Sequence, residues 1–264
     1  MEASITLKKV GKLVENKTIL AGLTFGVERG SLVAIVGVND SGKSILLKLL
    51  SGYENPDYGQ VFIHGLDIEK RRNETRKLIG YVPYENDLDP WLTIEQNIRF
   101  SANLYSIPKH ICDERLKKHS KSLMLEPYLD EFALKVSGGV QKKAMLVRSL
   151  VHDPEILILD EPTGYMDAES IRLTWDLLKK INPIAIIHFA ASSDVGESMV
   201  NPTKYYHNNV AGTISLLEAM QSNGLQNIVF SSSCAIYGIP SSDKIKEDSI
   251  LNPISPYGNS KLII

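Results

Sequence analysis

The sequence has 264 residues, which is enough for one large domain or two modest ones. Its 43% hydrophobic and 23% charged residues are typical of a globular chain, and a net charge of −2 gives no global electrostatic basis for binding nucleic acid or an anionic membrane. Apolar runs stay short of the ~20 residues of a membrane span, and charged residues interrupt the start of the chain, so we expect neither a direct membrane span nor a signal peptide.

Strands and helices alternate along the whole chain. Periodicity in the first part predicts strands at residues 5–10, 18–27, 32–36 and 60–64, with a glycine-containing loop at 37–44 and a helix at 45–50. Further on, helices are expected at 92–105, about 110–123, 137–150, 167–180 and 205–221, and strands at 155–160, 184–189 and 227–231. This order predicts an α/β fold with a mainly parallel sheet and a helical insertion at about 90–150.

The loop at residues 37–44 reads Gly-Val-Asn-Asp-Ser-Gly-Lys-Ser and matches the pattern G-x-x-x-x-G-K-[ST]. It lies between an apolar strand and an apolar helix, and this context disfavours a chance glycine-rich turn. Its backbone N–H groups are suited to cradle phosphates. Lys43 would reach the β- and γ-phosphates of ATP, and the Ser44 hydroxyl would bind Mg²⁺. The nucleotide-binding candidates are Gly37, Asn39, Asp40, Ser41, Gly42, Lys43 and Ser44.

A second candidate feature is the pair of carboxylates, Asp160 and Glu161, at the end of the apolar strand 155–160. One carboxylate at such a position can support Mg²⁺, and its neighbour can polarise an attacking water. Acidic residues at the end of a strand are common, so the pair alone is a weak indication of function. Here it follows Ser137-Gly138-Gly139 by about twenty residues, and that combination is specific.

Over about residues 3–180 these features resemble the nucleotide-binding subunits of ABC transporters. The matching segments are the loop 37–44, Val-Ser-Gly-Gly-Val-Gln-Lys-Lys at 136–143, the acidic strand end, Glu-Pro-Thr-Gly-Tyr-Met-Asp at 161–167 and Ile-Gly-Tyr-Val-Pro at 79–83. The resemblance implies a P-loop NTPase with N-terminal antiparallel strands. It also implies that Asp160 supports Mg²⁺ and that Glu161 is the general base.

Several further expectations come from the same resemblance. Ser137 and Gly139 would contact the γ-phosphate of ATP bound to an opposing protomer, which implies a homodimer or heterodimer through the signature motif with Asp167 at its seam. Membrane-spanning transporter subunits would be partners, which places the chain in the cytoplasm at the inner face of the membrane. The segment 88–97 looks most like exporter subunits.

The chain departs from the family pattern at several site positions. Val14 stands where the family stacks an aromatic ring on adenine, and Tyr84 stands where it has a glutamine that contacts Mg²⁺ and water. Asp40, Val140 and Tyr165 replace other family residues. We expect ATP binding to survive these changes better than ATP turnover.

Residues 183–264 instead resemble UDP-glucose 4-epimerase, of the extended short-chain dehydrogenase/reductase family, as a partial Rossmann-like βαβ segment. The segments that carry the resemblance are 186–198, 205–210, 229–238 and 255–261. Tyr257 and Lys261 are four residues apart, hence on one helix face, where the ammonium would lower the phenol pKa. Ser233 would bind the same substrate hydroxyl. The positions matched to the lining of the nicotinamide cofactor are Phe189, Ala190 and Asn208.

Two parts of an epimerase are missing from the sequence. There is no G-x-x-G-x-x-G loop, and the chain continues for three residues beyond Lys261. We therefore expect no bound NAD and no epimerase activity. The predicted division is an ATPase domain at 1–182, with a helical subdomain at about 90–150, and a truncated epimerase-like segment at 183–264.

The junction of the two halves raises two structural hypotheses. Strand 184–189 can pair with strand 155–160 through a right-handed crossover by helix 167–180, and strand 227–231 would then add as the next strand. His188 ends strand 184–189 near the place where the ABC family has a histidine that senses the γ-phosphate. It is either a substitute for that histidine or an ordinary residue at a sheet end.

Three functions remain to be weighed. The chain is an ATP-binding, weakly hydrolysing ABC-type subunit; an NAD-dependent epimerase-like fragment completed by a partner; or a fusion of two reading frames with no evolved function. The intact phosphate loop favours the first over the second. The residues leave the first and the third open.

Overall fold

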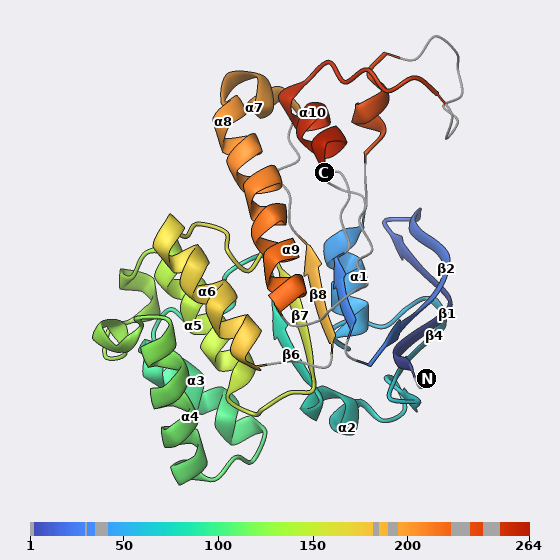
Figure 1. Cartoon of the computed structure of the whole chain (residues 1–264). Coiled ribbons are helices and arrows are strands. Elements are labelled where there is room, and N and C mark those ends of the chain that lie inside the picture. Colours follow the sequence, from blue (N-terminus) through green and yellow to red (C-terminus); the bar gives the residue numbers. More distant parts are fainter. Residues whose placement is uncertain are drawn as a thin grey trace.

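An antiparallel sheet forms the N-terminal part of the protein (Figure 1). The computed structural model describes residues 3–29, 31–34, 42–181, 185–189, 195–222, 233–239 and 249–264. The strands of this sheet are β1 (Ala3–Val14), β2 (Lys17–Glu28), β4 (Tyr58–Ile63) and β5 (Leu66–Asp67), in the order β2-β1-β4-β5. The β1–β2 turn places Glu15 and Asn16 at positive φ, as tight hairpin turns require. The predicted antiparallel strands are confirmed.

A parallel sheet lies at the centre of the protein. It contains β3 (Ser31–Ala34), β6 (Ile79–Val82), β7 (Ile156–Asp160) and β8 (Ala185–Phe189), in the order β3-β8-β7-β6. Along β7, Ile156 and Ile158 pack in the core that contains helix α1 (Lys43–Leu50), whereas Leu157 and Leu159 pack in the core of the helical insertion. The continuous apolar run is therefore buried on both faces, as predicted.

The helical insertion is confirmed. Its helices are α3 (Ile94–Leu104), α4 (Lys109–Ser122) and α5 (Gly138–Leu150), with 3₁₀ turns at Glu126–Tyr128 and Ala133–Lys135. A capping box starts α3, because the Thr93 side chain accepts from the Gln96 N–H while the Gln96 side chain accepts from the Thr93 N–H. Helix α6 (Ala168–Ile181) follows β7, and the short α2 (Arg72–Lys77) precedes β6.

The neighbours of β8 confirm one prediction and overturn another. β8 pairs in parallel with β7, as expected for a crossover through α6. Its other edge pairs with β3, with Ser31 opposite Ala185. The place beside β8 is thus filled by the strand that precedes the phosphate loop, and the prediction that strand 227–231 would lie there is wrong. Residues 227–231 are themselves outside the described residues.

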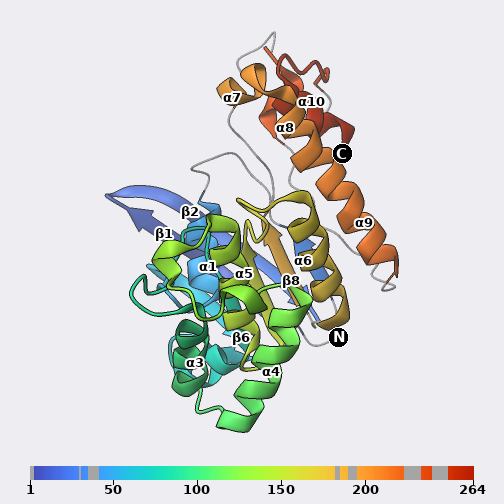
Figure 2. The same ribbon diagram turned by 90° about the vertical axis from the view of Figure 1, so that its left-hand side faces the viewer.

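The C-terminal part is helical where it is described. Its elements are α7 (Val195–Val200), α8 (Pro202–Tyr205), a π-helical stretch at Tyr206–Ala211, α9 (Gly212–Ser222), a 3₁₀ turn at Cys234–Tyr237 and α10 (Pro256–Ile263). The predicted helix 205–221 thus spans three successive stretches. Helix α9 runs beside α6 (Figures 1 and 2). Tyr205 and Tyr257 meet edge to face with ring centroids 6.4 Å apart, and both are fully buried.

Within the described ranges, none of the helices combines the length and the apolar character that a membrane span requires.

Burial of His119 in the helical insertion predicts a loss of stability in acid. Burial, with the charge of Lys118 as a smaller cause, lowers the pKa of His119 to about 4 from its ordinary 6.5. Well above pH 6.5 the imidazole is neutral in both states, so it contributes no pH dependence there. As the pH falls from 6.5 to 4, the unfolded chain binds a proton that the folded chain does not, and the folded state is destabilised by roughly 2 kcal/mol at pH 5.

Urea unfolding at pH 7 and pH 5 tests this expectation. Between these pH values the wild type should lose about 2 kcal/mol more of its free energy of unfolding than His119→Leu does. His110, an exposed histidine of the same helix, provides the control, and His110→Leu should follow the wild type. Identical pH dependence in the wild type and His119→Leu would contradict the prediction.

Candidate functional site

The phosphate loop ends at the start of helix α1. Gly42 lies at φ 86°, and a Cβ there would come within 2.6 Å of Ile19 Cγ2, so both conformation and space require glycine. Lys43 is the first residue of α1, and Ser44 follows it. The backbone N–H groups of this first turn are at the positive end of the helix, which suits an anion. The other loop candidates, Gly37, Asn39, Asp40 and Ser41, lie outside the described residues.

The carboxylates predicted to act with this loop stand opposite it. Asp160 is the last residue of β7 and is 3% exposed. Its carboxylate accepts a hydrogen bond from the Ser44 hydroxyl. Its Oδ2 atom is buried and has no hydrogen-bond partner among the residues described. The Ser44 hydroxyl and the Oδ2 atom of the Asp160 carboxylate fit Mg²⁺, which commonly takes few protein ligands beside phosphates and water.

Burial raises the pKa of both carboxylates. For Asp160 the rise is opposed by the Ser44 hydrogen bond and by the charges of Lys142 and Lys43. For Glu161 burial is again the largest cause, and the neighbouring charge of Asp160 adds to it. Glu161 also lies at φ 44°, in the left-handed region where a non-glycine residue is strained. Buried acids next to lysine charges are frequent at catalytic sites.

The signature-like segment begins helix α5. The Ser137 Oγ atom accepts from the Val140 N–H at 3.4 Å and caps the helix. Gly139 is packed so closely that a Cβ would lie 2.8 Å from the Tyr165 carbonyl oxygen. The structure therefore brings this segment against the loop that follows Glu161. The predicted contact of Ser137 and Gly139 with a nucleotide on a second protomer stays a prediction.

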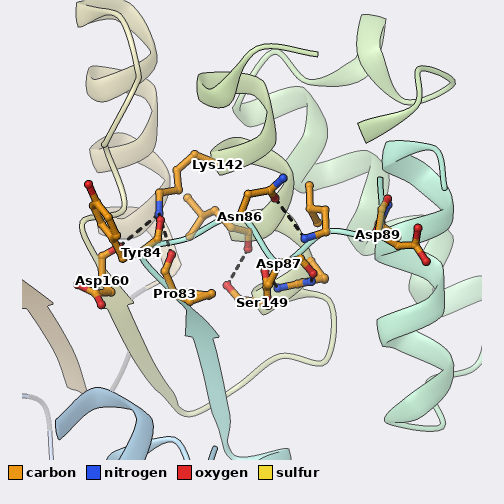
Figure 3. A network of polar contacts seen from close by, with 12 residues as sticks. Pro83, Tyr84, Asn86, Asp87, Asp89, Lys142, Ser149 and Asp160 are labelled. Atoms are coloured by element: carbon orange, nitrogen blue, oxygen red, sulfur yellow. Dashed lines mark hydrogen bonds and ion pairs between the residues drawn. The ribbon is translucent and has the colours of Figure 1, made fainter. Parts of the chain in front are cut away.

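A buried lysine of α5 links several parts of the site (Figure 3). Lys142 Nζ donates to the carbonyl oxygens of Pro83 and Tyr84, each at 2.7 Å, and to that of Asp160 at 3.4 Å. The sequence predicted no individual role for this residue. A basic residue in helix α5 gave no signal of its own, because its partners are far away in the sequence.

Two of the departures from the ABC pattern contact one another. Tyr84 and Tyr165 line the same cavity of about 380 Å³, together with Lys142. A hydrogen bond with Tyr165 is the largest cause that raises the pKa of Tyr84 to about 12. Tyr165 lies at φ 65°, a conformation that glycine adopts without strain. The two tyrosines thus line a cavity between the loop after β6 and the start of α5.

Three other candidate residues predicted from the resemblance to ABC subunits or to the epimerase lie in β8 and at the start of α6. His188 and Phe189 lie in β8 opposite Leu159 and Asp160, so the His188 backbone is at the same sheet end as the carboxylates. Whether His188 senses a phosphate stays a prediction. Asp167 caps α6, because its carboxylate accepts from the Ser170 N–H at 2.7 Å.

The epimerase-like candidates are partly brought together. Tyr257 and Lys261 both lie on α10 and are buried, and Ser233 starts the preceding 3₁₀ turn. Burial, with the like charge of Lys43, lowers the pKa of Lys261 to about 8. Asn208 is exposed on the π-helical stretch, and Ala190 is outside the described residues.

Comparison with known proteins agrees with the geometry of the first half. The profile of the ABC transporter family matches residues 20–164, more than half of the chain. The chain belongs to the ABC transporter family. A profile described as GDP-mannose 4,6 dehydratase matches residues 163–264, a smaller share of this ABC family chain.

Similar curated proteins are ATP-binding proteins of export systems. Nod factor export ATP-binding protein I of Burkholderia pseudomallei is 31% identical over 179 residues, which cover 68% of this chain and 59% of that protein. The chain thus spans little more than half the length of that relative. Bacitracin export ATP-binding protein BceA of Halalkalibacterium halodurans is 30% identical over 189 residues, covering 70% of this chain and 74% of that protein.

A solved ABC cassette shows the same fold. A dimeric ATP-binding cassette bound to ADP and phosphate after hydrolysis aligns with a TM-score of 0.65 at 24% identity. The alignment covers 73% of this chain and 89% of the cassette. The predicted P-loop NTPase fold is confirmed.

Proposed function

We propose that this chain binds Mg-ATP at the phosphate loop and hydrolyses it weakly, as the ATP-binding subunit of an ABC-type exporter. The observation that carries the proposal is the meeting of Ser44 and Asp160. The hydroxyl that follows Lys43 at the start of α1 hydrogen-bonds a carboxylate at the end of β7. The next residue along the chain is Glu161, a half-buried acid whose pKa is raised.

In the proposed phosphoryl transfer, different side chains bind the phosphates, hold Mg²⁺ and activate the water. Lys43 and the N–H groups of α1 bind the phosphates, and Ser44 and Asp160 would hold Mg²⁺. When bound, Mg²⁺ neutralises charge that develops on the transferring phosphoryl group. Glu161 orients the attacking water and accepts its proton, for which a carboxylate with a raised pKa is well suited. Tyr84, in place of a glutamine, makes the turnover slow.

The proposed setting is the inner face of a membrane. Membrane-spanning subunits would be the partners, and the names of the export relatives support export as the direction. Two cassettes would pair through the signature motif, with Ser137 and Gly139 of one facing ATP on the other. The dimeric cassette with ADP and phosphate supports this arrangement.

Substitution of Lys43 tests the nucleotide site. Lys43→Ala should weaken binding of Mg-ATP about tenfold or more, because a charge-assisted contact contributes ~1.5–3 kcal/mol. Titration calorimetry of purified wild type and variant measures the dissociation constants. Lys48→Ala removes a lysine from the same helix, one that pairs with Glu54 at 3.5 Å, and should bind ATP like the wild type. Equal affinity of wild type and Lys43→Ala for Mg-ATP would overturn the assignment.

The epimerase-like residues do not carry a second proposed function. Tyr257 is fully buried, and the sequence has no glycine-rich loop of the dinucleotide-binding kind. A tyrosine, lysine and serine without a positioned dinucleotide cannot transfer a hydride. NAD is therefore not proposed as a cofactor.

A further inference from the structure

The Lys142 ammonium is the unusual feature of the ATPase site. Lysine is almost never fully buried unless it is paired, yet Lys142 is 3% exposed. Its three N–H donors have three carbonyl acceptors, on Pro83, Tyr84 and Asp160. Nζ also lies 5.7 Å from the centre of the Tyr84 ring. A buried cation with this many directed bonds fixes the relative positions of the groups it joins.

The bonded carbonyls belong to two separate parts of the site. Pro83 and Tyr84 begin the loop that follows β6, residues 83–89, called here the post-β6 loop. The third carbonyl is that of Asp160, in the peptide group that joins Asp160 to Glu161. Lys142 therefore holds the backbone next to the proposed general base against the start of the post-β6 loop. Figure 3 shows the side chain extending from α5 to both.

The outer part of the post-β6 loop has other supports. Arg148, also on α5, donates to the carboxylate and the carbonyl of Asp87. Asn97 of α3 accepts from the Asp89 N–H at 2.8 Å and donates to the Asp89 carbonyl at 3.0 Å. These contacts hold the loop to the helical insertion, whereas the Lys142 contacts join it to the end of β7. Substitutions can therefore remove the contacts of the outer loop and the Lys142 contacts separately.

We propose that Lys142 is a positioning residue for ATP hydrolysis, which fixes the Asp160–Glu161 peptide and Tyr84 relative to each other. The proposal rests on the proposed function, because it needs Glu161 to be the general base. Lys142 acts through Glu161 and Tyr84 and need not touch the nucleotide. Loss of the ammonium would let the base and the Tyr84 phenol move, and a displacement of about 1 Å can lower a rate by about 100-fold.

The test compares Lys142→Met with Arg148→Met. Methionine retains much of the length of the lysine stem but cannot donate. We expect Lys142→Met to lower kcat about 10- to 100-fold while the dissociation constant of Mg-ATP stays within about threefold. Arg148→Met, which releases the outer part of the same loop, should keep kcat within about threefold. Lys142→Arg keeps a charged donor and should restore most of the rate.

Two further measurements separate positioning from general stability. Hydrogen exchange of peptides that cover residues 158–164 should be faster in Lys142→Met than in the wild type, and unchanged in Arg148→Met. In a Tyr84→Ala background, Lys142→Met should lower kcat by less than it does alone, because both changes disturb one unit. Additive effects on kcat, or equal exchange in both methionine variants, would overturn the proposal.

The outcomes for the two proposals are distinct. A wild type that binds Mg-ATP but does not turn it over overturns the proposed hydrolysis, and the exchange at 158–164 then decides whether Lys142 positions the end of β7. A wild type that hydrolyses ATP while Lys142→Met keeps the same kcat overturns the Lys142 assignment alone. A Lys142→Met protein that loses ATP binding and folding stability together also overturns it, because the role is then structural.

Discussion

Replacement of Glu161 by glutamine is expected to lower the rate of ATP hydrolysis at least about 100-fold, the usual contribution of a general base. Glutamine has the same shape as glutamate but cannot accept the proton of the attacking water. Binding of Mg-ATP should remain, because Lys43, Ser44 and Asp160 make the proposed phosphate and Mg²⁺ contacts. The measurement is steady-state release of phosphate, together with titration of Mg-ATP.

The control for this variant lies at the other end of the same strand. Glu155 precedes β7, and its Oε2 atom lies 3.4 Å from His64 Nε2. Glu155→Gln therefore changes a carboxylate outside the proposed site. It should hydrolyse ATP at the wild-type rate. Hydrolysis that persists in Glu161→Gln would show that Glu161 is not the base.

The pH profile adds an independent check on Glu161. Burial and the charge of Asp160 raise its pKa above the ordinary 4.5. A base must be deprotonated to act, so kcat should fall as the pH drops through the pKa of Glu161. The residual activity of Glu161→Gln should lack this acid limb.

The second prediction with a large effect is a loss of folding stability when a residue of β7, the strand that ends at Asp160, is substituted. Ile158 is fully buried at the middle of β7 and packs in the core shared with α1, the helix that begins at Lys43. Ile158→Ala should lower the free energy of unfolding by about 2–5 kcal/mol, because it removes apolar contacts and leaves a cavity. Urea unfolding at pH 7 measures the change.

An exposed aliphatic residue provides the comparison for Ile158. Val200 is 87% exposed at the end of α7, and Val200→Ala should change the free energy of unfolding by less than about 0.5 kcal/mol. A cost below about 1 kcal/mol for Ile158→Ala would mean that β7 is not the centre of the core.

The sequence by itself predicted most of the strands and helices that the structure describes in the first part of the chain, and where the phosphate loop ends. The apolar run at 155–160 predicted a strand covered on both faces, and the structure buries every residue of Ile156–Asp160. The glycine-lysine-serine ending of the loop predicted its junction with α1. Such features are local, because the periodicity of side chains indicates which face is buried and turn residues indicate where an element ends.

Only the tertiary structure decided which elements became neighbours. The sequence predicted β8 beside β7 but not β3 on its other edge, because an apolar strand can pair equally well with several others. Lys142 shows the same limit at the level of one side chain. Its partner Pro83 is 59 residues away, and a lysine in a helix is expected at the surface unless the fold brings carbonyl groups to it. Burial and hydrogen-bond geometry are properties of the packed chain, so they had to come from the fold.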